Sequence, residues 1–129
     1  LTSETAYAFR LTEVYLLKAE AIVRSGGDVN EAKTIVKDIQ SRAGVTDFSA
    51  IENASGTDDI LLQIYYEDVR SLVGEDGQEW MALLRLPFAT VQTIKPTIED
   101  RIQYILPVPR TEFLNNPQFG EQNKGYQKL

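Results

Sequence analysis

The acidic residues are the side chains of this sequence that could do chemistry, since it has 19 Asp and Glu but no histidine and no cysteine. Two carboxyl groups flanking a glycosidic bond can hydrolyse it, one as the acid and the other as base or nucleophile. Adjacent pairs occur at Asp58–Asp59, Glu75–Asp76 and Glu99–Asp100. All three fall at expected helix starts or in loops, where acidic residues cap helices or face water. We therefore expect structural roles for them and no catalytic residue.

The missing histidine and cysteine exclude further classes of site from this stretch of chain. Ser–His and Cys–His catalysis, thiolate and imidazole metal sites and disulfides all need these residues. The 129 residues suit one ordinary domain, and 43% hydrophobic and 25% charged residues are typical of a globular protein. A net charge of −6 argues against nucleic acid as a partner. We expect no metal and no cofactor.

The aromatic side chains could instead stack on sugar rings, because Tyr and Trp combine a flat face with a polar edge. Tyr65 and Trp80 fall on apolar helical stripes, so we expect both in the core. The sequence leaves Tyr66, Phe88 and Tyr104 open. The other aromatic residues considered for stacking are Phe113, Phe119 and Tyr126. No ligand-binding residue can be assigned, so the binding site stays unknown at this point.

Helices should position these side chains, because apolar residues recur every three to four positions. We expect four of them, at about residues 10–25, 29–43, 58–73 and 78–85. The first two are joined by a short turn containing Gly26 and Gly27, which requires them to run antiparallel. Asp28 should cap the second helix, with Glu31 in the spacing of a capping box, although Asn30 is an alternative cap.

Opposite charges lie one helical turn apart at three places, where they can pair on one face. The pairs are Arg10–Glu13, Glu20–Arg24 and Glu67–Arg70. We expect the first and the last to be structural. Thr57 or Asp58 should cap the third helix.

Two stretches lack helical periodicity. Residues 44–57 indicate a polar linker, and residues 87–129 indicate a long irregular tail that wraps a surface. Prolines at 107 and 109 keep the extended run around them out of a central strand. One helical turn at residues 111–116 is left open.

One segment, Gly27 to Ala32, resembles the turn between the two helices of a tetratricopeptide repeat. A single copy is visible, whereas such repeats need about three stacked neighbours to bury a continuous core. Glu20 stands where that repeat normally has a small residue. The expected fold class is mainly α, with antiparallel, tetratricopeptide-like helix pairs and a long irregular C-terminal segment.

Four segments, in order, resemble the C-terminal part of the SusD/RagB family of outer-membrane nutrient-binding lipoproteins. The run RLTEVYLLKAEA at 10–21 is similar to the family's R-x-x-E-v-y-L-x-x-A-E-A helix, and SRAG at 41–44 to its R-A-G stop. Residues 67–85 resemble its E-R-x-x-E-L-x-x-E-G-x-R-W-x-D-L-x-R block. Residues 105–126 resemble its closing l-P-I-P-x-x-E, N-P and Q-N-P-G-Y. The resemblance therefore extends over most of residues 1–129, which we expect to form a single SusD/RagB C-terminal-like region.

The sequence departs from the family pattern at five positions. Asp68, Ser71, Glu79 and Ala82 replace residues that are usually Arg, Glu, Arg and Asp, and Lys124 replaces a proline. The apolar stripe is intact, so the fold should survive these changes. A charge network shared with the family is the property that they put in question.

The resemblance implies a non-catalytic binding function. It implies a mainly helical, tetratricopeptide-like scaffold that binds an oligosaccharide or another nutrient and works with a SusC-like, TonB-dependent transporter at the surface of the outer membrane. The chain begins at Leu1 and its one methionine is Met81, which suggests a mature product or a piece of a longer protein. The family's lipid-anchor cysteine lies outside this chain. An alternative is a protein-interaction scaffold that docks such a transporter, and a carboxylate glycosidase ranks third.

Overall fold

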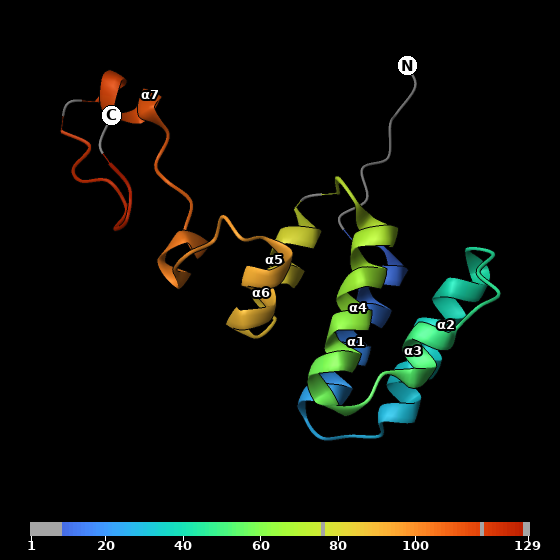
Figure 1. The fold of residues 1–129 in the computed structure, drawn as a ribbon. Helices are drawn as coiled ribbons and strands as arrows, with labels where there is room; N and C mark the ends of the chain where they lie inside the picture. The colour runs from blue at the N-terminus through green and yellow to red at the C-terminus, as the bar shows by residue number, and fades with distance from the viewer. Residues whose placement is uncertain (1–8, 76, 117, 128–129) are drawn as a thin grey trace, which may run out of the picture. The chain divides into compact units, whose positions relative to one another are not determined.

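The computed structural model describes residues 9–75, 77–116 and 118–127, and within these ranges it is helical with no strand (Figure 1). The chain divides into two compact units, Leu1–Leu86 and Pro87–Leu129. The described part of the first unit contains α1 (Leu11–Arg24), α2 (Val29–Arg42), α3 (Ser49–Asn53), α4 (Gly56–Leu72) and α5 (Gln78–Leu84). The mainly α, tetratricopeptide-like fold class expected from the sequence is confirmed.

The first two helices form the expected antiparallel hairpin, and α1 also packs against α4 (Figure 1). Gly26 adopts a φ of 73°, a left-handed conformation that glycine reaches without a Cβ clash. Asp28 is the N-cap of α2 and accepts a hydrogen bond from the backbone N–H of Asn30 at 2.9 Å, as predicted. Glu31 forms no capping box, because its carboxylate pairs with Lys18 on α1 at 2.7 Å.

Small and branched apolar residues make the core of this unit. Ala19 of α1 and Ala32 of α2 are both 0% exposed, and side chains this small let the two helices approach closely. The remaining buried apolar residues of the helices are Leu16, Val23, Ile35, Val36, Ile51, Ile60, Leu61, Ile64, Tyr65, Leu72, Ala82 and Leu83. The core therefore lies where α1, α2 and α4 meet, with α3 and α5 packed at its edges.

Cationic side chains cover the carboxyl ends of three helices. Arg10 donates to the carbonyl of Ser71 in the last turn of α4 at 3.2 Å, and Arg24 donates to the carbonyl of Arg85 after α5 at 2.7 Å. Lys33 donates to two carbonyls at the end of α3, at 2.9 and 2.7 Å. The last carbonyls of a helix lack partners within it and carry the negative end of its dipole, so these contacts stabilise all three ends.

The structure differs from the sequence expectation at two points in this unit. The stretch 44–57, expected to be a linker, contains the short helix α3. Helix α4 starts at Gly56, so its N-cap is Ser55 and neither Thr57 nor Asp58 caps it. Asp58 and Asp59 lie inside the first turn instead, where their charges favour the positive end of the helix dipole.

The second unit is more regular than the predicted irregular tail. It contains α6 (Phe88–Ile94), the 3₁₀ helix η1 (Arg101–Tyr104) and α7 (Arg110–Asn115), the last close to the helical turn left open at 111–116. Pro87 and Pro109 are the N-cap residues of α6 and α7. A proline at a helix start interrupts no hydrogen bond of that helix, which is why both positions tolerate it.

Side-chain amides hold the extended run between η1 and α7. Gln122 accepts from the backbone N–H of Val108 at 2.7 Å and donates to its carbonyl at 2.9 Å. Asn123 donates to the carbonyl of Leu106 at 2.7 Å. These amides take the place of a neighbouring strand, which explains how the run stays extended without a sheet.

Candidate functional site

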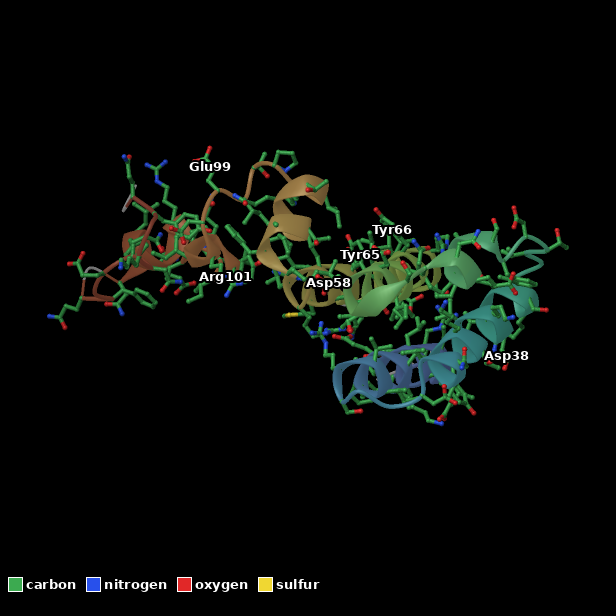
Figure 2. All side chains as sticks on the ribbon, turned by 60° about the horizontal axis from the view of Figure 1, so that its bottom comes forward. Asp38, Asp58, Tyr65, Tyr66, Glu99 and Arg101 are labelled. Carbon is green, nitrogen blue, oxygen red and sulfur yellow. The ribbon has the colours of Figure 1, made fainter. Side chains whose placement is uncertain are left out.

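The carboxylate pairs do not form a catalytic site in the described residues. Asp58 and Asp59 are exposed on the first turn of α4, and Figure 2 labels Asp58 there. Glu75 forms an ion pair with Arg10, whereas Asp76 lies outside the described residues. None of the three described members of these pairs is desolvated beside another carboxyl, which acid–base work requires.

The third pair is used for local structure. Asp100 caps η1 by accepting from the backbone N–H of Ile102 at 2.9 Å, and Gln103 returns a bond to the Asp100 N–H, which completes a capping box. Glu99 is exposed beside it (Figure 2). The structural roles predicted for Glu99–Asp100 therefore fit the observed geometry.

A buried charge cluster, which we define as Glu20, Arg24, Asp68, Glu79 and Arg85, links α1, α4 and α5. Glu20 is 9% exposed and accepts from Arg24 at 2.7 Å and from two nitrogens of Arg85 at 2.8 to 3.0 Å. Burial pushes the pKa of Glu20 upward, but the hydrogen bonds from Arg85 and Arg24 outweigh burial and hold it below its usual range. The predicted Glu20–Arg24 pair is confirmed, and Arg85 extends it across helices.

Asp68 lacks the hydrogen bonds that Glu20 receives. It is 7% exposed, and no described residue donates a hydrogen bond to its side chain. Burial raises its pKa to about 6; the charge of Arg85 opposes the rise, and the charges of Glu20, Glu13 and Glu79 add to it. One carboxylate oxygen of Glu79 is also buried without a hydrogen-bond partner.

The cavity beside this cluster is too small for a nutrient. It is lined by Glu20, Tyr65, Asp68 and Arg85 among others and has a volume of about 10 Å³, which corresponds to one water molecule. A ligand pocket typically has a volume of roughly 300 to 1,000 Å³. The charge cluster is therefore a structural feature that joins three helices.

Glu67, the residue before Asp68 on α4, is another buried carboxylate, and it has several hydrogen-bond donors. Glu67 is 3% exposed and accepts from Arg70 at 2.8 and 3.2 Å, from Gln40 of α2 at 3.1 Å and from Ser71 at 3.0 Å. The predicted Glu67–Arg70 pair is confirmed as a structural one. The predicted Arg10–Glu13 pair is wrong, because Arg10 reaches to the end of α4 and pairs with Glu75.

A groove of ligand size lies between α1, α2 and α4. It consists of two hollows of about 600 and 620 Å³ that share Arg10, Leu11, Thr12 and Arg42. The first hollow is also lined by Tyr15, Ile35, Asp38, Ile39, Ala43, Val45, Glu67, Arg70 and Ser71. We call this feature the α1/α2/α4 groove. The groove could not be predicted from the sequence, because its lining comes from three helices and its residues share no local motif.

The aromatic residues divide into core and surface. Tyr65 is 9% exposed, as predicted, whereas its neighbour Tyr66 is 38% exposed with the two ring centres 5.6 Å apart (Figure 2). Trp80, expected in the core, is only partly buried. Among the surface aromatics of the first unit, Phe9 and Tyr15 line the α1/α2/α4 groove and Tyr66 lies outside it.

The aromatic residues of the second unit pair with each other. Phe88 and Tyr104 have ring centres 6.2 Å apart, and the guanidinium of Arg101 lies 5.6 Å from the Phe88 ring centre. Phe113 and Phe119 meet edge to face at 5.5 Å. The hydroxyl of Tyr126 donates to the carbonyl of Gln103 at 3.4 Å. These contacts account for the packing of this unit without requiring a sugar.

Comparison with known proteins decides the family. The model of the SusD family matches residues 1–87, which is the larger part of the chain. The chain belongs to the SusD family. Neither the curated proteins nor the solved structures gave a match. Members of the SusD family are nutrient-binding proteins rather than enzymes. The match ends at residue 87, so a family region that continues to residue 129 stays a prediction.

The geometry explains several residues of the SusD-like pattern. Arg10 covers the end of α4, and Glu20 and Arg85 join α1 to the residue that follows α5. The departures at Asp68 and Glu79, where the pattern has arginines, place carboxyl groups in the cluster: Asp68 is 7% exposed, and one oxygen of Glu79 is buried without a hydrogen-bond partner. The doubt that the sequence raised about a shared charge network therefore applies to these two positions.

The membrane relation of the chain is not decided by its helices. No helix in the described ranges combines the length and the apolar character needed to cross a bilayer. Those ranges also hold no group of three or more acidic side chains arranged to hold a metal ion.

Proposed function

We propose that the chain is part of a non-catalytic, nutrient-binding component of an outer-membrane uptake system, with an oligosaccharide as its ligand. The proposed partner is a SusC-like, TonB-dependent transporter, and the proposed location is the cell surface of the outer membrane. The observation that carries this proposal is membership of the SusD family over residues 1–87.

The side-chain geometry supports the non-catalytic part of the proposal. The buried carboxylates Glu20 and Glu67 are held by arginines, and the cavity beside Asp68 has room for about one water molecule. A glycosidase needs two carboxyl groups on opposite sides of a sugar, in a cleft that admits the chain. The described residues offer no such arrangement.

The test uses a panel of oligosaccharides. The chain is titrated with neutral and acidic glycans by calorimetry, and the same mixtures are assayed for new reducing ends over time. Binding without new reducing ends is the expected result. Time-dependent release of reducing ends that one Asp→Asn or Glu→Gln change abolishes would replace the proposal by a glycosidase. A Tyr66→Ala variant, beside Tyr126→Ala as its control, shows whether the exposed ring on α4 takes part.

The second candidate function is a tetratricopeptide-like scaffold that docks the transporter. It is favoured by the apolar face that α1 leaves exposed, where Leu11 is 65%, Val14 51% and Tyr15 45% exposed. Co-expression with a SusC-like transporter and affinity purification tests it. If no glycan binds and the transporter co-purifies, this function is preferred; if the transporter does not co-purify, it is rejected.

A further inference from the structure

The α1/α2/α4 groove has an aromatic side chain in each of its two hollows. Tyr15 lines the hollow of about 600 Å³, and Phe9 lines the hollow of about 620 Å³. Both rings are open to solvent, with Tyr15 45% and Phe9 72% exposed. Leu11 and Arg42 lie in the lining that the two hollows share. Each hollow has the usual volume of a ligand pocket, so the groove that they form together suits a ligand of several linked rings.

The charges in the lining of the groove cancel. They belong to three arginines and three carboxylates, namely Arg10, Arg42, Arg70, Asp38, Glu67 and Glu75. Arg10 pairs with Glu75, and Arg70 pairs with Glu67, so four of the six charges are neutralised within the chain. A lining with no charge excess favours neither a strongly acidic nor a strongly basic ligand. The charge balance therefore points to an uncharged occupant.

The other two charged groups of the groove can still take hydrogen bonds from a ligand. Asp38 and Arg42 lie one turn apart on α2, where Figure 2 labels Asp38, and both side chains are exposed. No described residue forms a hydrogen bond or an ion pair with either of them. A guanidinium only donates and a carboxylate only accepts, whereas a hydroxyl does both. A ligand rich in hydroxyls can therefore use both groups at once.

A sugar chain meets these requirements better than a protein segment does. The C–H faces of sugar rings are apolar and stack on flat aromatic side chains, while their hydroxyls point outward to polar groups. An amphipathic helix needs a continuous apolar groove. Here the charged side chains of α2 and α4 interrupt the apolar lining.

We propose that the α1/α2/α4 groove binds an uncharged oligosaccharide, with one sugar ring on Tyr15, a second on Phe9, and hydroxyls on Arg42 and Asp38. Arg42 lines both hollows, so it is placed to contact both rings. The inference rests on the proposed function and adds to it the binding site and the charge of the ligand.

The experiment titrates the full 129-residue chain by calorimetry with hexasaccharides of known composition. Maltohexaose, cellohexaose, xylohexaose and mannohexaose are the uncharged probes, and hexagalacturonate is the acidic one. We expect at least one uncharged probe to bind, and hexagalacturonate to bind no more tightly. The affinity for the best uncharged probe should change by less than about twofold between roughly 0.05 and 0.3 M salt, because the ligand has no charge to screen.

The variants locate the site. Tyr15→Ala should weaken the best uncharged probe by about tenfold, because a stacking surface is lost. Tyr66→Ala is its control, since it removes a ring that is 38% exposed outside the groove, and the affinity should stay within about twofold. Arg42→Met should weaken binding by about fivefold. Arg110→Met makes the same change at the exposed start of α7 and should have no effect. Circular dichroism confirms that each variant is folded.

Three results would overturn the inference and leave the proposed function standing. They are native affinity in both Tyr15→Ala and Arg42→Met, equal losses in Tyr15→Ala and Tyr66→Ala, and tighter binding of hexagalacturonate than of every uncharged probe. In each case an oligosaccharide still binds the native chain, so only the site or the charge of the ligand is wrong. If no probe binds the native chain, the inference and the oligosaccharide ligand of the proposed function are both rejected.

Discussion

The charge cluster between α1, α4 and α5 and the α1/α2/α4 groove both place arginines beside apolar surface, yet their arginines have different partners. Arg85 binds both oxygens of Glu20, and Arg24 binds Glu20 as well as a backbone carbonyl. In the groove, Arg42 contacts no acidic group of the described residues. The charges of the cluster hold helices together, whereas Arg42 is exposed and makes no such contact among the described residues.

The same contrast occurs within α4, on two successive residues. Glu67 and Asp68 are 3% and 7% exposed. Glu67 accepts hydrogen bonds from α2 and from its own helix, whereas no described residue donates one to the side chain of Asp68. Glu67 therefore stabilises the unit, and Asp68 lowers its stability once the carboxyl is charged. Burial alone does not decide the effect of a carboxylate, because the outcome depends on which donors the neighbouring turns supply.

The largest effect should follow from removing the arginine of the cluster. Arg85→Met leaves Glu20 with Arg24 alone and takes the one opposing charge from Asp68. We expect a loss of about 3 kcal/mol in the free energy of unfolding, at the low end for a broken buried pair because Arg85 is 37% exposed. Urea denaturation at pH 7 measures it.

Arg42→Met is the matched control for this prediction. No described residue forms an ion pair or hydrogen bond with its exposed guanidinium, so we expect a change below about 0.5 kcal/mol. Equal losses for the two variants would show that the contacts of Arg85 with Glu20 contribute no more to stability than the exposed Arg42 does.

A smaller loss in the free energy of unfolding is expected at Glu67, whose carboxylate accepts several hydrogen bonds. Glu67→Met removes the acceptor for Gln40, whose amide is 6% exposed and would be left without a partner. The expected cost is about 2 kcal/mol in urea denaturation, and Glu67→Gln should recover part of it because an amide oxygen still accepts. A full recovery, or no cost in either variant, would contradict the role assigned to Glu67.

Asp68→Asn should have the opposite sign. At pH 7.5 the amide removes a buried charge and keeps the shape, so we expect a gain of about 1 to 2 kcal/mol in the free energy of unfolding. The gain should shrink toward zero as the pH falls below about 4. Loss of stability at pH 7.5 would show that Asp68 has a partner after all.

The pH dependence of the native chain follows from the same residue. Asp68 has a pKa of about 6 in the fold against 3.8 as the reference value, so between these values the folded chain binds a proton that the unfolded chain has released. Stability therefore falls as pH rises from about 4 to 6 and is constant above. Glu20 has a lowered pKa, so its contribution is present above 4.5 and is lost as pH falls further. Melting curves across this range should place the most stable pH near 4, where the two windows meet.

The smallest effect is expected at the surface. Lys18 and Glu31 join α1 to α2 with side chains 54% and 49% exposed. Lys18→Met should cost less than about 0.5 kcal/mol and should cost less still at high salt. A loss comparable to that of Arg85→Met would show that burial does not explain why the Glu20–Arg85 pair stabilises the fold more than the Lys18–Glu31 pair.

The sequence predicted the hairpin and the long helix α4 well, since their signals are local. Apolar spacing, the Gly26 turn and the Asp28 cap act within a few residues. It also identified Glu20–Arg24 and Glu67–Arg70, which lie within one helix. Helix α6 falls in the stretch expected to be irregular, because seven residues show little periodicity and a proline can begin a helix as well as end one.

Local sequence patterns could not predict the long-range arginine contacts or the lining of the groove. Arg85 meets Glu20 across 65 positions, and Arg10 meets Glu75 across 65 positions. Nothing in the spacing of either pair shows that contact. The groove likewise depends on three helices, so the residues that line it are far apart in the sequence.

The most direct test of the central claim compares the two kinds of arginine in one sample. The exchange of the side-chain Nε–Hε protons of Arg42 and Arg85 with water is followed by NMR in the native chain. The account predicts slow exchange at Arg85, whose Nε–H donates to both oxygens of Glu20, and fast exchange at the exposed Arg42. Equal exchange at the two sites, or slower exchange at Arg42, would contradict it.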